Sequence, residues 1–533
     1  MKFQYARLRA LLVPLFVSGL SAAALPAFAD DKAEIDRLKS LIEELDQRVK
    51  IVDRKLEIAN EEATVKQKSA AVLTASNTGF GLKSADGQFE YKLRGLVHLD
   101  YRNYEGDAFP SAIDGFTARR IRPTFEGTVF GKYGFRFTPE FGENKSAVVD
   151  AYLDARFDPA AQLRLGKFKP FVGLERLQSG SDIKFIERSY VSNNILPNRD
   201  LGLSLSGDVL NKKLNYAVGV FNGVIDGGEN TTTQDTNGDK EFTARLFATP
   251  FSDSDGALRG LGFGMAGTFG NAHGVATSST VTSNLPTYKT PGQANSFFSY
   301  KSKAASATSA ADNVIANGQR VRWSPQAHFY HGPFGVIAEY AGVSQDVKIG
   351  TTAATLNNNA WQIAGSWLLT GEDAGFKGVK PYNAFNANGG LGAWEIVTRY
   401  QENNIDKDAF VNFVDSAKAN AASAKTWGVG LNWYLNQSSK FAFNLEQTRF
   451  SDGTGAGKLD GKKETFAVAR YQLAFKTDPQ IHRLSPQSSG LPRPVWGFFF
   501  RRLQPKRLLT PSPAYLKFIY QHAERFVLLI TNE

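Results

Sequence analysis

The densest group of basic side chains in this sequence is Arg119-Arg120-Ile121-Arg122. A guanidinium carries a planar fork of N–H donors that fits the oxygens of a phosphate or carboxylate group. Successive side chains of a strand point to opposite sides, and the apolar neighbours of this cluster leave Arg120 and Arg122 on the polar side. The cluster therefore predicts anion binding by arginines that line a water-filled space.

Further charged side chains lie opposite the apolar stripe of their own segments. The basic ones are Lys92, Arg94, Arg136, Arg156, Arg164, Arg245, Arg399 and Arg470, and the acidic ones are Asp100, Glu126, Asp150, Asp154 and Glu395. If the arginines prevail, the space that they line selects anions. If the carboxylates neutralise them, the result is a mixed lumen of ion pairs with weak selectivity. The sequence alone leaves both interpretations open.

Holding so many charged side chains on one side requires many alternating strands. The segment ETFAVARYQLAF, from Glu464 to Phe475, sets its apolar residues on one face and stops at an aromatic residue, a pattern typical of outer-membrane strands. Similar segments recur through residues 69–475, and at roughly 25 residues per strand and connection they give an even number near sixteen. We predict an all-β transmembrane barrel of about 16 antiparallel strands.

The beginning of the chain predicts export. Lys2, Arg7 and Arg9 precede an apolar run that ends in the small-residue site Ala27-Phe28-Ala29. Residues 1–29 are therefore predicted to be a secretory signal peptide. The alternative is a membrane anchor, for which the apolar run is short.

The end of the chain departs from the barrel pattern. Residues 476–533 are rich in proline and arginine and show no clear alternation before Tyr515. We expect an atypical C-terminal extension that is disordered or loosely helical; the alternative is a short helix over Ala514–Ile530. This extension and the signal peptide carry most of the formal net charge of +10, so the basic balance of the chain says little about the lumen.

Several motifs follow one another in a fixed order between residues 79 and 475. They are Ala118-Arg119-Arg120 with Phe125-Glu126-Gly127-Thr128, Gly166-Lys167-Phe168 with the segment from Phe171 to Ser179, Phe185-Ile186-Glu187-Arg188, Gly392-Ala393-Trp394-Glu395-Ile396, and Leu431-Asn432-Trp433-Tyr434. In this ordered set the chain resembles the phosphate-selective porins O and P of Gram-negative outer membranes. The resemblance implies a trimer of sixteen-stranded barrels, in which loops fold inward to form a narrow, arginine-lined constriction.

The resemblance also implies roles for individual residues. Arg119 and Arg120 match the paired arginines near the constriction, and Asp150 matches its lone acid. Arg176 matches a basic residue of the constriction loop, with Ser179 as a hydroxyl partner.

Two features differ from the family pattern. The loop around Lys289 has a single lysine where the family has a ladder of arginines, and Leu96 occupies a first-strand arginine position, with Arg94 two residues earlier. The predicted anion site therefore comprises Arg94, Arg119, Arg120, Arg122, Asp150, Arg176, Ser179 and Lys289.

Residues 30–68 precede the barrel and form a heptad pattern. Apolar residues recur at spacings of three and four, with Ile35, Ile42, Val49 and Leu56 at position a. We predict a periplasmic coiled coil that oligomerises the protein; the alternative is a single amphipathic helix, solvated or lying on the barrel. The residues at a favour a dimer, whereas the resemblance implies a trimer. The sequence leaves that conflict open.

Together these features predict an outer-membrane porin for diffusive uptake of anions, phosphate or polyphosphate, through an arginine-lined constriction. The alternatives are a general or sugar-type porin of weak selectivity and a structural envelope tether that uses the coiled coil. The expected partners are small anions, outer-membrane lipid, two further copies in a homotrimer, and a periplasmic or peptidoglycan contact of the coiled coil. The six histidines show no catalytic or metal-binding arrangement. We therefore expect no enzyme activity and no cofactor. We also expect no nucleic-acid partner.

Overall fold

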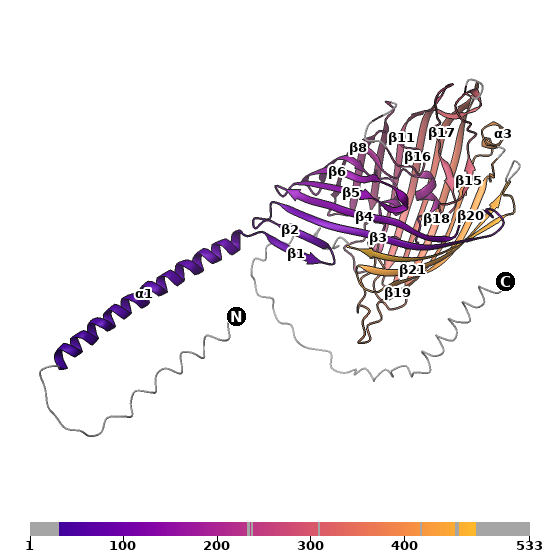
Figure 1. Ribbon diagram of the computed structural model, residues 1–533. Helices are drawn as coiled ribbons and strands as arrows, with labels where there is room; N and C mark the ends of the chain where they lie inside the picture. Colours follow the sequence, from indigo (N-terminus) through magenta and orange to yellow (C-terminus); the bar gives the residue numbers. More distant parts are fainter. Residues whose placement is uncertain are drawn as a thin grey trace, which may run out of the picture. The chain divides into compact units, whose positions relative to one another are not determined.

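Alternating apolar and polar side chains form long strands in this protein. The computed structural model describes residues 31–231, 235, 238–306, 310–415, 418–452 and 458–475. Among them, sixteen antiparallel strands form one closed barrel (Figure 1). These strands are β3 (Glu90–Glu105), β4 (Gly115–Val129), β5 (Tyr133–Glu140), β6 (Ala147–Asp158), β7 (Ala161–Phe168), β8 (Asp200–Val209), β9 (Leu214–Phe221), β10 (Glu241–Ala248), β11 (Leu261–His273), β16 (Val314–His331), β17 (Phe334–Ile349), β18 (Thr352–Leu368), β19 (Ala393–Asn404), β20 (Ser423–Tyr434), β21 (Ser439–Ser451) and β22 (Lys463–Ala474).

The first and last of these strands close the barrel. β22 pairs with β3 in a register that runs from Thr465 opposite Glu105 to Ala474 opposite Leu96. Closure matters because a lipid environment offers no partner to the backbone groups of a free sheet edge. The strand count and the closed antiparallel arrangement confirm the fold predicted from the sequence.

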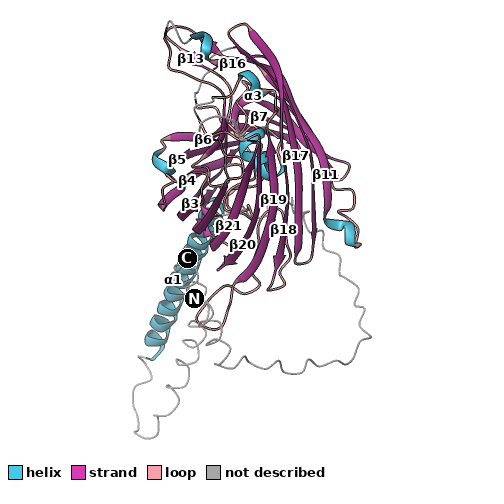
Figure 2. Ribbon diagram, turned by 90° about the vertical axis from the view of Figure 1, so that its right-hand side faces the viewer, coloured by secondary structure: helices cyan, strands magenta, loops and turns pink. Residues whose placement is uncertain are grey.

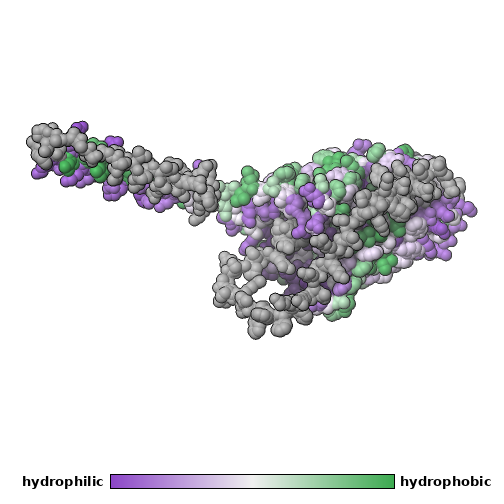
Figure 3. Space-filling view, turned by 90° about the horizontal axis from the view of Figure 1, so that it is seen from below, coloured by the Kyte–Doolittle hydropathy of each residue, from purple (hydrophilic) through white to green (hydrophobic). Residues whose placement is uncertain are grey.

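Side chains alternate between the two faces of the barrel wall. In β10, Glu241 and Arg245 are buried on the inside, while Phe242 and Leu246 are more than half exposed on the outside. Figure 3 shows apolar residues on the outer surface of the barrel and hydrophilic residues toward its middle. The wall is thus apolar outside and polar inside, as a barrel in lipid requires.

One connection folds back into the lumen. Residues 169–199 link β7 to β8 and contain two helical turns, α2 (Leu174–Leu177) and η2 (Val191–Ile195), visible in Figure 2 as short helices inside the ring of strands. This loop contacts β17 and β18, strands that are distant from β7 and β8 in the barrel order. It corresponds in position to the constriction loop that the resemblance implies, and we use the name constriction loop for residues 169–199.

The constriction loop is fixed to the wall by hydrogen bonds. Glu339 of β17 accepts hydrogen bonds from the backbone N–H groups of Leu174 at 2.6 Å and Glu175 at 3.2 Å. The backbone N–H of Tyr190 donates to Gln401 of β19 at 2.8 Å, and that of Ile186 donates to Asn444 of β21 at 2.6 Å. These bonds satisfy backbone donors that would otherwise be unpaired in the interior.

Part of a second long connection, which follows β11, also packs inside the barrel. Tyr288, Phe297 and Phe298 of this loop are fully buried against apolar residues of the constriction loop, such as Val191 and Ile195. The apolar cluster extends to β16, β17 and β18. The remaining short elements are η1 (Gly142–Asn144), η3 (Ala257–Gly260), β12 (Val275–Ala276), β13 (Val281–Thr282), β14 (Thr287–Lys289), β15 (Ser296–Ser299), η4 (Ala310–Asp312) and α3 (Ala409–Asn412).

The predicted heptad region is one long helix, α1 (Asp31–Ser69). Its heptad residues are about half exposed: Ile35 50%, Ile42 64%, Val49 54% and Leu56 57%. Among the helices that the structure describes, none is long and apolar enough to cross a membrane.

Two predicted regions lie outside the described residues. They are the signal peptide over residues 1–29 and the C-terminal extension over residues 476–533. Both remain predictions from the sequence.

A hairpin lies between α1 and the barrel. It consists of β1 (Val72–Ser76) and β2 (Gly79–Lys83), and β2 pairs with the first residues of β3. Along β3, the pairing with β2 begins where the pairing with β22 ends. The backbone N–H of Phe475, which follows β22, donates to the carbonyl of Gly95 at 2.9 Å, and Leu93, two residues before Gly95, pairs with Phe80 of β2.

Candidate functional site

A β-bulge sends two consecutive arginines into the lumen. Along the β3–β4 pair, His98 lies opposite Arg120, but the next residue, Leu99, lies opposite Ala118. Arg119 is therefore the extra residue of the bulge. Strict alternation would turn Arg119 toward the outer face, whereas the bulge lets it join Arg120 inside.

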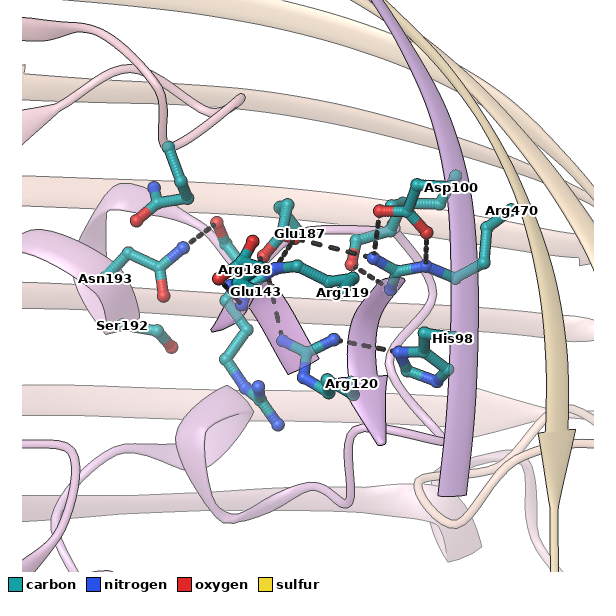
Figure 4. A network of polar contacts seen from close by, with 12 residues as sticks. His98, Asp100, Arg119, Arg120, Glu143, Glu187, Arg188, Ser192, Asn193 and Arg470 are labelled. Atoms are coloured by element: carbon teal, nitrogen blue, oxygen red, sulfur yellow. Dashed lines mark hydrogen bonds and ion pairs between the residues drawn. The ribbon is translucent and has the colours of Figure 1, made fainter. Parts of the chain in front are cut away.

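The two arginines belong to a buried ion network around Glu187 of the constriction loop (Figure 4). Glu187 contacts Arg119 at 2.7 Å, Arg102 at 2.9 Å, Arg470 at 3.5 Å and Arg120 at 3.8 Å. Asp100 pairs with Arg470 at 2.6 Å and with Arg102 at 2.9 Å. We call the set Glu187, Asp100, Arg102, Arg119, Arg120 and Arg470 the Glu187 network.

Glu187 stays ionised in this network. Burial raises the pKa of its carboxyl group, but Arg119 and the other arginines around it outweigh burial and hold the pKa well below the usual range. The charged Glu187 neutralises part of the arginine cluster that the sequence singles out.

Arg120 is the most enclosed arginine of the predicted cluster, with 4% of its surface exposed. Its Nη1 lies 3.0 Å from Nδ1 of His98. A guanidinium only donates, so His98 accepts at Nδ1 and donates from Nε2 to Gln472 at 2.9 Å. His98 therefore positions Arg120 and adds no positive charge.

Other predicted residues of the wall also have partners of opposite charge. Arg122 pairs with Glu140 at 2.5 Å, Arg94 with Glu126 at 2.7 Å, and Asp150 with Arg199 at 3.0 Å. The wall of β3 to β6 is therefore a series of ion pairs, close to the mixed lumen that the sequence left open.

A different arrangement surrounds Arg176. Three cations of the constriction loop, Lys169, Arg176 and Arg188, form no ion pair with any residue that the structure describes. Carbonyl oxygens hold them instead: Lys169 and Arg188 both donate to the carbonyl of Gln178, at 2.8 and 2.7 Å, and Arg176 donates to the carbonyl of Ser192. We call these three residues the loop cation cluster.

The three cations affect each other's protonation. Burial lowers the pKa of each, and repulsion from neighbouring cations such as Arg199 adds to this effect, whereas Glu175 partly offsets it at Arg176 and Arg188, and Asp150 at Lys169. The pKa of Arg176 falls to about 9, that of Arg188 to about 10, and that of Lys169 well below its usual value. An anion placed among them would offset this repulsion and favour their charged forms.

A cavity of about 460 Å³ brings two predicted residues together nearer the external loops. Arg119 and Lys289 both line it, together with Arg102 and Lys145. Asp114 and Glu143 contribute negative charge, and Glu143 pairs with Arg119 at 3.0 Å. The cavity thus has a mixed lining with an excess of cations.

Comparison with known proteins identifies the family. Residues 89–475 match the family of phosphate-selective porins O and P. The chain belongs to this family. It is an outer-membrane porin, and the porins are channel proteins.

The relatives of this porin include a curated protein and several solved structures. Porin O of Pseudomonas aeruginosa is 21% identical over 445 residues, which cover 77% of this chain and 94% of that protein. The outer-membrane channel DcaP of Acinetobacter baumannii is 14% identical with a TM-score of 0.45, over 74% of this chain and 99% of that one. OmpF of Salmonella typhi, in complex with daunomycin, is 10% identical with a TM-score of 0.43, over 75% of this chain and 100% of that one.

The predicted site of the porin is spread over several places, because Arg94, Arg122 and Asp150 lie in separate ion pairs. Arg119 and Arg120 lie in the Glu187 network, Arg176 lies in the loop cation cluster, and Lys289 lies at the cavity. The hydroxyl of Ser179 accepts a hydrogen bond from that of Ser181 at 3.0 Å, while Arg176 is held by Asn198 and Ser192.

The sequence prediction left Lys169 and Arg188 out of the site. Both lie in the loop, where strand alternation gives no information about direction. A usable signal was present: the connection between the strand ending at Phe168 and the strand beginning at Asp200 holds five basic residues among its charges.

Proposed function

We propose that this porin conducts anions, of the phosphate or polyphosphate type, and holds them transiently at the loop cation cluster. The observation that carries the proposal is that Lys169, Arg176 and Arg188 are grouped without a carboxylate partner among the described residues. Arginine and lysine N–H donors in a partly dry passage favour an anion strongly, because charge counts for more there than in water. The family name, phosphate-selective, supports the same class of solute.

Arg119, Arg120, Arg122, Arg94 and Lys289 contribute in a different way under this proposal. Their carboxylate partners weaken the field of the four arginines, so these residues guide an anion toward the loop. Asp150, through Arg199, moderates how strongly the anion is held. A pore must bind its ion tightly enough to admit it and weakly enough to release it.

The test uses the full-length porin in planar lipid bilayers. The reversal potential in a potassium chloride gradient reports selectivity, and the fall in chloride current on adding phosphate reports binding. Anion-selective current with phosphate block supports the proposal. Nonselective current without block would favour a general or sugar-type porin, and no current would favour an envelope tether.

A matched pair of variants locates the site. Lys169→Gln removes one charge of the loop cation cluster and keeps an N–H donor for the Gln178 carbonyl. Lys184 belongs to the same loop but pairs with Glu395 at 2.6 Å, so Lys184→Gln together with Glu395→Gln removes a cation and its partner. Lys169→Gln should weaken phosphate block by about tenfold, the effect of one charge-assisted hydrogen bond, and the control pair should leave it unchanged.

The weakly selective porin remains the second candidate because a specific observation favours it. Arg119, Arg122 and Arg94 each have a carboxylate partner, as a lumen of neutralised ion pairs would have. The two candidates differ in whether Lys169→Gln changes phosphate block.

We also propose that α1 forms a parallel coiled coil between copies of the chain, after removal of a signal peptide. The support is the half-exposed heptad face, together with predicted pairs of opposite charge such as Glu34 with Lys39 and Arg48 with Asp53. A homotrimer would match the family resemblance, and α1 would then reach periplasmic components such as peptidoglycan. Analytical ultracentrifugation of the detergent-solubilised protein, with and without residues 30–68, measures its oligomeric state.

A further inference from the structure

The β1–β2 hairpin continues the barrel wall past the end of β22. The register of the hairpin on β3 sets Phe80 opposite Leu93 and Leu82 opposite Tyr91. Directly opposed residues of antiparallel strands share a face. Leu93 and Tyr91 have the same parity as Leu99, which is exposed on the outside of the barrel.

The hairpin has two chemically different faces. The outward face carries Leu73, Ala75, Phe80 and Leu82, because Leu73 lies opposite Leu82 and Ala75 opposite Phe80. These large apolar side chains are strongly exposed: Leu73 82%, Phe80 54% and Leu82 44%. The other face carries the polar side chains of Thr74, Ser76 and Lys83, together with Val72.

The outward face is continuous with an aromatic belt. The ring of Phe80 packs edge-on against that of Phe475 at 5.7 Å, and Phe89 packs against Phe130 at 5.1 Å. Phe130 lies at the short turn between β4 and β5, and short turns mark the periplasmic end of such barrels. Aromatic side chains gather where the hydrocarbon of a membrane meets its headgroups.

The free edge of β1 fixes the depth of the hairpin. β1 pairs with β2 on one side, and among the described residues no strand pairs with its other side. Unpaired backbone groups are excluded from hydrocarbon but are satisfied by water among headgroups. The hairpin therefore belongs at the interface of the membrane, with its apolar face toward the acyl chains.

We propose that the outward face of the β1–β2 hairpin binds the phospholipids of the inner leaflet at the level of the aromatic belt. In this position β2 covers the part of the β3 edge that β22 leaves free, and lipid covers β2 and β1. The first residues after α1 are then part of the membrane-embedded wall. The proposal does not depend on the solute that the pore conducts.

The absence of cysteine from the sequence makes a direct test available. Single variants Leu73→Cys and Leu82→Cys on the outward face, and Thr74→Cys and Lys83→Cys on the other, receive a nitroxide spin label in the full-length porin. The porin is reconstituted into vesicles of phosphatidylethanolamine and phosphatidylglycerol. Collision rates with oxygen, which concentrates in lipid, and with a water-soluble nickel chelate are then measured for each label. All four positions are exposed, so the labels fit without repacking.

We expect labels at 73 and 82 to shift toward oxygen and away from nickel, as at Leu153→Cys on the outside of β6, where Leu153 is 63% exposed. Labels at 74 and 83 should collide more with nickel, so that accessibility alternates with the strand period. Two results would overturn the proposal. The first is that all four labels show the same oxygen and nickel collision rates as a label at Ser40→Cys in α1, which would mean that both faces of the hairpin lie in water. The second is spin–spin broadening at positions 73 and 82 that grows with the labelled fraction, which would mean that a second copy of the chain, and not lipid, covers the outward face.

Discussion

The Glu187 network and the loop cation cluster are two groups of buried cations in one lumen, and they differ in their counter-charges. Arg102, Arg119 and Arg470 surround the carboxylates of Glu187 and Asp100 at 2.6 to 3.5 Å. Lys169 and Arg188 meet only carbonyl oxygens within the described structure. A carboxylate partner neutralises the charge of a buried cation locally, whereas a protonated cation without such a partner exerts its field on a solute.

The comparison predicts a large difference between two double variants that remove equal charge. Arg176→Gln with Arg188→Gln should weaken phosphate block by about 100-fold, because each charge-assisted hydrogen bond contributes roughly 1.5–3 kcal/mol. Arg120→Gln with Arg122→Gln should weaken it far less, because these arginines lie beside Glu187 and Glu140. The phosphate concentration that halves the chloride current gives both values. A stronger effect of the wall variant would reverse the assignment of the two groups.

Removing a carboxylate should make the first group resemble the second. Glu187→Gln leaves the arginines of the Glu187 network without their shared partner, so phosphate block should tighten by about tenfold. The same change should lower the free energy of unfolding by about 3 kcal/mol, because it breaks a buried network. Bilayer titration measures the first effect and heat-dependent gel mobility the second. Glu143→Gln, at a partly exposed pair, is the control and should change both little.

The pH dependence of selectivity should come from the loop cation cluster. A cation with a lowered pKa is charged below that pKa and loses its charge as pH rises through it. Anion selectivity should therefore decline as pH rises, first as Lys169 loses its charge and again as pH passes about 9, the pKa of Arg176. Reversal potentials over a pH series measure the decline, and Arg176→Gln should remove the step near pH 9. On the acid side, the low pKa of Glu187 predicts no change through the ordinary carboxyl range.

The smallest effect is expected at Asp150. This residue pairs with Arg199, one of the charges that faces the loop cation cluster. Asp150→Asn frees Arg199 and should tighten phosphate block by about threefold, or about 0.7 kcal/mol, because Arg199 acts on the anion from beside the loop cation cluster. Looser binding in this variant would mean that Asp150 acts by holding Arg199 in place.

Alternation in the sequence predicted the barrel and its strand number because a strand in lipid must repeat the same pattern. It also put Arg120 and Arg122 on the inside correctly. The pattern did not reveal the bulge at Arg119, since a bulge depends on the pairing of two strands. The resemblance, not the alternation, pointed to Arg119.

The pairing of charges could not be predicted from the sequence for a similar reason. Glu187 comes from the constriction loop, Arg470 from the last strand and Arg102 from the first. The spacing of these residues along the chain does not indicate that their side chains are in contact. Parity also gives no direction for loop residues, so Lys169 and Arg188 stayed outside the predicted site.

The ion pair between Asp100 and Arg470 joins residues that are 370 positions apart, across the seam where β3 meets β22. During assembly, Asp100 and Glu187 therefore lack one of their guanidinium partners until the last strand is in place. Contacts of such long range form late, because the chain between them must first be ordered. The charge network thus links the last strand of the wall to the constriction loop, and we expect the loop to gain its full set of charge contacts only when the barrel closes.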